Sequence, residues 1–64
     1  MDKEEYVELK TMDNTKVRFL RKNVGAIEEI PASARTEGYI KVYVGGFAFQ
    51  IAMEFDEVTK AIYG

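Results

Sequence analysis

A pair of glycines, Gly45 and Gly46, separates two segments in which apolar residues alternate with other residues. Two-residue hairpin turns need positive φ angles, which glycine adopts without a steric cost. The sequence therefore predicts a β-hairpin within residues 39–52. The register set by this turn gives the apolar pairs Val44–Phe47, Val42–Phe49 and Ile40–Ile51. A shift of one residue would divide these six residues between both sides of the hairpin, so we expect this register and an apolar side that faces the core.

A second hairpin is predicted near the start of the chain. Residues 4–10 and 16–20 alternate in the same way around a turn at residues 12–15. Matching their apolar sides gives the expected pairs Leu9–Val17, Val7–Phe19, Glu8–Arg18 and Glu5–Arg21. The last two pairs are predicted to be cross-strand ion pairs.

The rest of the chain predicts one more strand and a terminal helix. The apolar residues Val24, Ala26, Ile27 and Ile30 predict a short strand over residues 26–30, which Pro31 would end because proline lacks the N–H donor of a β-ladder. A single helical turn at residues 23–27 is the alternative for this stretch. Residues 31–38 are a polar loop, and residues 55–63 place apolar side chains at i, i+3 and i+7, which predicts a helix docked on the apolar hairpin side.

These elements predict a small α+β fold in a single domain, residues 1–64. We expect a curved antiparallel sheet of four to five strands, built from two hairpins, with one C-terminal helix. A chain of 64 residues buries only about 60% of the surface that it exposes when unfolded. It also has no cysteine with which to form disulfides, so self-association is expected to add stability.

Composition narrows the possible chemistry. The chain has no histidine, no cysteine and a single serine, Ser33, which excludes Ser-His and Cys-His nucleophiles and the usual ligand sets of zinc, haem and iron–sulfur clusters. Catalysis by carboxylates, tyrosine or lysine would need an enclosed cleft, and a fold this small rarely encloses one. We therefore expect a protein that is not an enzyme and that holds no metal and no cofactor.

Charge and hydropathy bear on the partners and the compartment. The formal net charge of −2 argues against nucleic-acid binding, although a local basic run is present at Lys16, Arg18, Arg21 and Lys22. No apolar run approaches the roughly 20 residues that a membrane helix needs. The acidic start of the sequence lacks the basic and apolar regions of a signal peptide, so a cytoplasmic location without membrane association is expected.

The candidate binding residues are Tyr39, Lys41 and Tyr43, which share the non-core side of the second hairpin. Their expected neighbours on the facing strand are small or neutral: Ala48, Gln50 and Ala52. This side is either covered by another part of the chain or forms a protein interface, for which tyrosine is well suited because it buries a large area with little loss of entropy. A stacking platform for single-stranded nucleic acid is a third, less favoured interpretation.

Two segments carry a family resemblance, NVGAIEEIP (Asn23–Pro31) and YIKVYVGGFAFQIAMEFDEV (Tyr39–Val58). Their order resembles that of the small bacterial FlbD proteins, which are linked to flagella and swarming. The resemblance covers most of the chain and implies the architecture only: two hairpins, an Ile-Glu segment before a proline, and a short terminal helix. The chain departs from that family in its first turn, which lacks Asn-Gly, and at Glu54, where a serine helix cap is expected. The family has no catalytic motif, so the resemblance assigns no functional residues.

The leading functional interpretation is a non-catalytic binding or regulatory protein of bacterial or phage origin. It would act through a protein–protein interface, self-associate and bind a protein partner. One alternative is a phage-encoded inhibitor of a host enzyme that uses an acidic surface formed by early and late carboxylates: Asp2, Glu4, Glu5, Glu8, Glu54, Asp56 and Glu57. Another is an oligomer that sequesters a small nucleotide-like ligand, and a further one is a nucleic-acid binder that uses the basic run.

Overall fold

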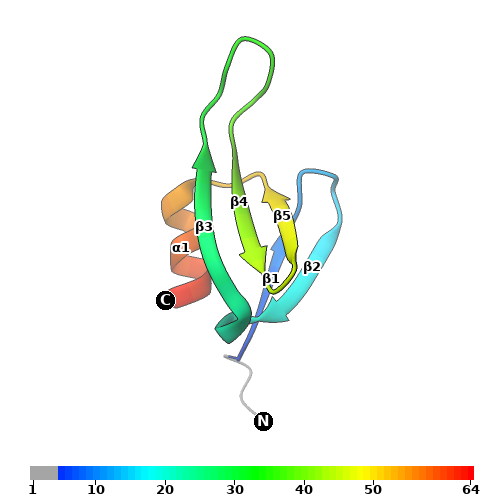
Figure 1. Ribbon diagram of the computed structural model, residues 1–64, viewed down its shortest axis with the longest axis vertical. Helices are drawn as coiled ribbons and strands as arrows, with labels where there is room; N and C mark the ends of the chain where they lie inside the picture. Colours follow the sequence, from blue (N-terminus) through cyan, green and yellow to red (C-terminus); the bar gives the residue numbers. More distant parts are fainter. Residues whose placement is uncertain (1–4) are drawn as a thin grey trace.

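The computed structural model describes residues 5–64, which form five β-strands followed by one α-helix (Figure 1). The first antiparallel sheet pairs β1 (Tyr6–Lys10) with β2 (Lys16–Leu20). The second contains β3 (Val24–Ile30), β4 (Tyr39–Val44) and β5 (Phe47–Ile51) in that order, and α1 spans Phe55–Tyr63. The predicted α+β class, both hairpins and the C-terminal helix are confirmed. The strands are divided between two sheets, and these sheets do not close into a barrel.

Both hairpins have the predicted register. In the second hairpin, Val44, Val42 and Ile40 face Phe47, Phe49 and Ile51. In the first, the observed pairs include Leu9–Val17, Val7–Phe19 and Glu8–Arg18. The second ladder ends at Ile51, so Ala52 is not paired with Tyr39 as predicted.

The third strand is longer than predicted. It begins at Val24, directly after a short 3-10 helix, η2 (Arg21–Asn23), and it contains a bulge between Val24 and Ala26. The alternative of a helical turn at residues 23–27 is therefore wrong, and the helical turn precedes the strand. Because η2 reverses the chain between β2 and β3, it connects the two sheets at one end of the molecule.

The helix begins and ends with specific polar contacts. Glu54 is the N-cap, and its backbone N–H donates to the carboxylate of Glu57 at 3.2 Å. At the other end, the guanidinium of Arg21 donates a hydrogen bond to the carbonyl of Ile62. Among the described residues Arg21 forms no ion pair with Glu5, so that predicted pair is wrong: the side chain of Arg21 is directed to the end of α1 instead.

The hydrophobic core lies between the two sheets and the helix. In Figure 1, α1 and β1 lie behind the sheet of β3, β4 and β5. The core consists of buried side chains from β1, β2, β4, β5 and α1: Val7, Leu9, Phe19, Ile40, Val42, Val44, Ile51, Val58 and Ile62. Phe47 is an exception to the expectation that the whole apolar side of the second hairpin faces the core. It is 73% exposed, because its pair with Val44 is the last before the turn and lies at the margin of the core.

The loop between β3 and β4, residues 31–38, extends away from the rest of the fold (Figure 1). Its base is narrow. A Cβ atom on Gly38 would lie 2.9 Å from the backbone nitrogen of Ala32 and 3.0 Å from the carbonyl oxygen of Ile30. At its tip, the N–H of Ser33 donates to the carbonyl of Thr36 at 2.8 Å. The loop is therefore closed at its base and makes its tip contacts within itself.

No helix within residues 5–64 combines the length and the apolar character required to span a membrane.

Candidate functional site

The three predicted binding residues lie in one row on β4, on the side of the sheet opposite the core. We call this side the outer face, and it is formed by Ala26, Glu28 and Ile30 of β3, Tyr39, Lys41 and Tyr43 of β4, and Ala48 and Gln50 of β5. The assignment follows from the pleat, because directly paired residues share a side and the intervening β4 residues Ile40, Val42 and Val44 are buried.

Tyr43 and Lys41 form a polar cluster with Glu28 on this face. The hydroxyl of Tyr43 donates a hydrogen bond to the Glu28 carboxylate at 2.7 Å. The ammonium nitrogen of Lys41 lies 5.4 Å from the centroid of the Tyr43 ring, within the range of a cation–π contact. Glu28 is also the direct cross-strand partner of Lys41. These contacts hold the Tyr43 ring in place over the sheet.

The cluster affects the ionisation of Tyr43. The hydrogen bond to Glu28 raises the pKa of the Tyr43 hydroxyl, because it favours the protonated form. Partial desolvation and the negative charge of Glu28 act in the same direction, whereas Lys41 opposes them. Tyr43 therefore presents a neutral hydroxyl at physiological pH.

Tyr39 lies at the other end of the row and has different surroundings. It is paired with Ile30 and lines a shallow, open pocket of about 190 Å³. The pocket lies between the base of the β3–β4 loop and the start of α1, and its other lining residues include Glu29, Pro31, Met53, Glu54 and Phe55. The row thus joins a polar cluster at Tyr43 to a small hollow at Tyr39.

The outer face is not covered by another element of the described chain. In Figure 1 the β3–β5 sheet lies in front, with α1 and β1 behind it. The three β4 side chains are nevertheless half-buried, because they pack against their neighbours on the face itself. Of the three interpretations of this side, the first, coverage by another part of the chain, does not occur within residues 5–64 (Figure 1).

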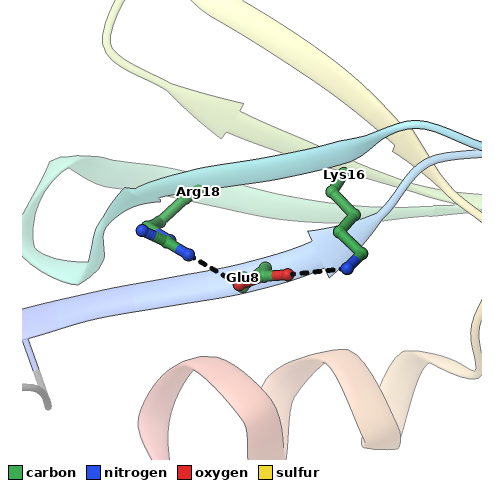
Figure 2. A network of polar contacts seen from close by, with 3 residues as sticks. All are labelled: Glu8, Lys16 and Arg18. Atoms are coloured by element: carbon green, nitrogen blue, oxygen red, sulfur yellow. Dashed lines mark hydrogen bonds and ion pairs between the residues drawn. The ribbon is translucent and has the colours of Figure 1, made fainter.

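The acidic residues do not gather in one place. Glu54, at the start of α1, lines the same pocket as Glu29. Glu8, in contrast, lies on the first hairpin, where it contacts Arg18 at 3.1 Å and Lys16 at 3.8 Å (Figure 2). The hydrogen bond and charge of Arg18 lower the pKa of the Glu8 carboxyl. Asp2 and Glu4 lie outside the described residues.

The basic run is also divided. Lys16 and Arg18 lie on the side of the first hairpin that is opposite the core, together with Glu8 and Lys10. The side chain of Arg21 is directed instead to the C-terminal end of α1, where it donates a hydrogen bond to the carbonyl of Ile62. Three cations therefore accompany one carboxylate on this side of the β1–β2 sheet, which we call the basic face.

Sequence reasoning did not identify two residues that matter for surface chemistry. Glu28 is not among the predicted binding residues, but it is the hydrogen-bond partner of Tyr43. Phe47 is the most exposed large hydrophobic residue in the described chain. The sequence contains one indication of this exposure, which is the position of Phe47 directly after the Gly-Gly turn. Residues 5–64 contain no group of three or more acidic side chains arranged to hold a metal ion.

A comparison of the chain with protein-family models, curated proteins and solved structures found no match.

Proposed function

We propose that this protein is a non-catalytic binding protein that acts through its outer face, with Tyr39 and Tyr43 as anchors and Lys41 fixing the orientation of the partner. We further propose that the chain self-associates. We also propose that it works in the cytoplasm, because disulfides are rare in that compartment and this chain has no cysteine with which to form them.

One observation supports this proposal above the others: the outer face carries two tyrosines and is left open by the described chain. The neighbours of Tyr43 on both adjacent strands are alanines, Ala26 and Ala48, so the ring stands between small side chains. Its position is fixed by Glu28 before any partner binds. A side chain that is already held in place loses less entropy on binding, which favours affinity.

The experiment is a comparison of two double variants by light scattering and by affinity capture at low and moderate salt. Tyr39→Ala with Tyr43→Ala is expected to abolish self-association or partner capture, while the protein stays folded. The control, Tyr6→Ala with Tyr63→Ala, removes two exposed tyrosines from other elements, 45% and 59% exposed, and should have no effect. If the outer-face variant retains both interactions, the proposal is wrong.

An acidic surface that inhibits an enzyme is the second candidate. It would not include Glu8 and would centre on the pocket at the start of α1, which Glu54 lines together with Glu29. Binding through such a surface would weaken steeply as salt screens the charges. Binding through the tyrosines would change little. The two salt conditions therefore separate the candidates, and Glu29→Gln with Glu54→Gln should weaken binding only if the acidic surface is used.

The alternative of a nucleotide-sequestering oligomer would need a larger site than the pocket beside Tyr39. The pocket at Tyr39, about 190 Å³, is smaller than the roughly 300 Å³ at which ligand pockets usually begin. A nucleotide site would therefore require residues from a second subunit to enlarge this pocket. A rise in melting temperature with a nucleotide, in the associated protein only, would support that alternative.

A further inference from the structure

The two sheets leave two strand edges next to each other. β2 and β5 are the end strands of their sheets, so each has an edge without a ladder partner among residues 5–64. Figures 1 and 2 both show β2 beside β5. At one end the gap between them is closed by the chain that follows β1, where Thr11 bridges Ile51 and the N–H of Met12 donates to the carbonyl of Gln50 at 2.9 Å. We call the gap between these edges the seam.

The backbone groups that face the seam can be assigned. In a hairpin with a two-residue turn, the flanking pair Val44–Phe47 is hydrogen-bonded, and such pairs then alternate along the ladder. Ala48 and Gln50 therefore direct their N–H and C=O groups away from β4, and the bond from Met12 to Gln50 agrees with this. The N–H and C=O of Ala48 have no backbone partner among the described residues.

Apolar side chains border the seam on its core side. Phe49 and Val17 are half-buried there, and the rings of Phe19 and Phe49 are stacked with their centroids 6.3 Å apart. Phe47 continues this row with 73% of its surface exposed. A pocket of about 360 Å³ opens between the two edges and is lined by Thr11, Asp13, Thr15, Val17, Ala48, Phe49 and Gln50. Extended backbone with apolar side chains directed inwards would fit these surroundings.

The charged residues of the first hairpin indicate which side chains an added strand would have on its outward side. The basic face lies on the β1–β2 sheet, where Lys16 and Arg18 are 77% and 68% exposed and both pair with Glu8. Lys10 lies on the same side of this sheet. Carboxylates on the outward side of an added strand would lie beside these cations.

We propose that the seam is a β-strand acceptor for an extended segment of a partner protein in which apolar residues alternate with Asp or Glu. The segment adds to the free edge of β5 through the backbone N–H and C=O of Ala48. Its apolar side chains pack on Phe47, Phe49 and Val17, and its carboxylates face Lys16 and Arg18. The segment would pair with the β5 backbone and not with the tyrosine side chains, so this proposal goes beyond the function proposed above and does not depend on it.

The test is an NMR titration of the full chain with the capped peptide Val-Glu-Val-Glu-Val. Saturable shifts are expected at the amides of Ala48 and Gln50, together with slower exchange of the Ala48 N–H. Two matched peptides should bind less well: Val-Lys-Val-Lys-Val, which reverses the charge, and Val-Glu-Pro-Glu-Val, which cannot complete the ladder.

Variants of the chain sharpen the same test. Phe47→Ala should weaken binding of the acidic peptide by about 5- to 30-fold, as expected for loss of one buried aromatic anchor. Tyr63→Ala, which removes an exposed aromatic side chain from α1, is the control and should leave binding unchanged. Lys16→Glu with Arg18→Glu should reverse the preference between the acidic and basic peptides.

Several results would overturn the proposal. One is the absence of saturable shifts, and another is shifts centred on the other free edge of the sheet, at β3. Equal binding of the acidic and basic peptides would show that the proposed preference for Asp or Glu in the partner segment is wrong. Shifts of Ala48 and Gln50 on simple dilution of the protein would mean that the seam is occupied by a second copy of this chain instead.

Discussion

The two hairpins follow the same alternating pattern but differ in how firmly the fold holds them. In β4 every second residue is buried, and Val42 is completely inaccessible. In β2 only Phe19 is buried, and Val17 is half-exposed beside the seam. The second hairpin is covered by α1 and the first hairpin, whereas β2 forms one border of an open gap. Equal patterning in a sequence therefore does not imply equal burial.

The same substitution in each hairpin should reveal this difference most clearly. Val42→Ala removes two buried methyl groups and leaves a cavity, so it should lower the free energy of unfolding by about 2–4 kcal/mol. Val17→Ala should cost about 1 kcal/mol, because part of that side chain is already in water. Urea denaturation measures both values. Equal losses would mean that the seam is closed in solution.

The turns provide a second comparison, of intermediate size. Gly45 and Asn14 both have left-handed backbones, with φ angles of 58° and 68°. Gly45→Ala should destabilise the protein by about 1–2 kcal/mol, the cost of a left-handed alanine. Asn14→Ala should lower the free energy of unfolding by less than about 1 kcal/mol. The native asparagine already has part of the energetic cost of a left-handed backbone, so the change to alanine adds only the rest. Gly46→Ala is the matched control: Gly46 does not have a positive φ and a Cβ atom there would meet no atom within 4 Å, so it should be nearly neutral.

The smallest effect concerns the charges on the first hairpin. Arg18 lowers the pKa of Glu8 in the folded protein, so the ionised carboxylate contributes stability at neutral pH. This contribution should be lost as the pH falls below the ordinary carboxyl pKa of 4.5 and through the lowered value. Thermal unfolding of the native chain and Glu8→Gln should therefore differ at pH 7 and converge in acid. Glu37→Gln, a loop variant with the same change in charge, should show no comparable convergence. Added salt should reduce the Glu8 effect, since both partners are exposed.

Much of the fold could be predicted because it depends on local patterns. The Gly-Gly turn fixed the second register, and the apolar alternation fixed the first. The position of Phe47 could not be predicted in this way, since alternation assigns a residue to one side of a strand but not to the middle or the margin of a core. Burial at the margin depends on where the other elements end.

The candidate site shows the same limit. The row of Tyr39, Lys41 and Tyr43 was predicted because it lies within one strand. Its link to Glu28 was not, because the pairing of β3 with β4 depends on a loop without a clear turn signal and on the bulge after Val24. The contact of Arg21 with Ile62 was missed for a related reason: it joins residues 41 positions apart in the sequence.

The loop between β3 and β4 sets a limit on how this chain can change during evolution. Its tip contacts itself, so substitutions or short insertions near Ser33 to Glu37 leave both strands as they are. Gly38 has no such freedom, because any side chain there would collide with backbone on the opposite side of the loop. Length and sequence can drift at the tip, whereas the position of Gly38 at the base is restricted to glycine.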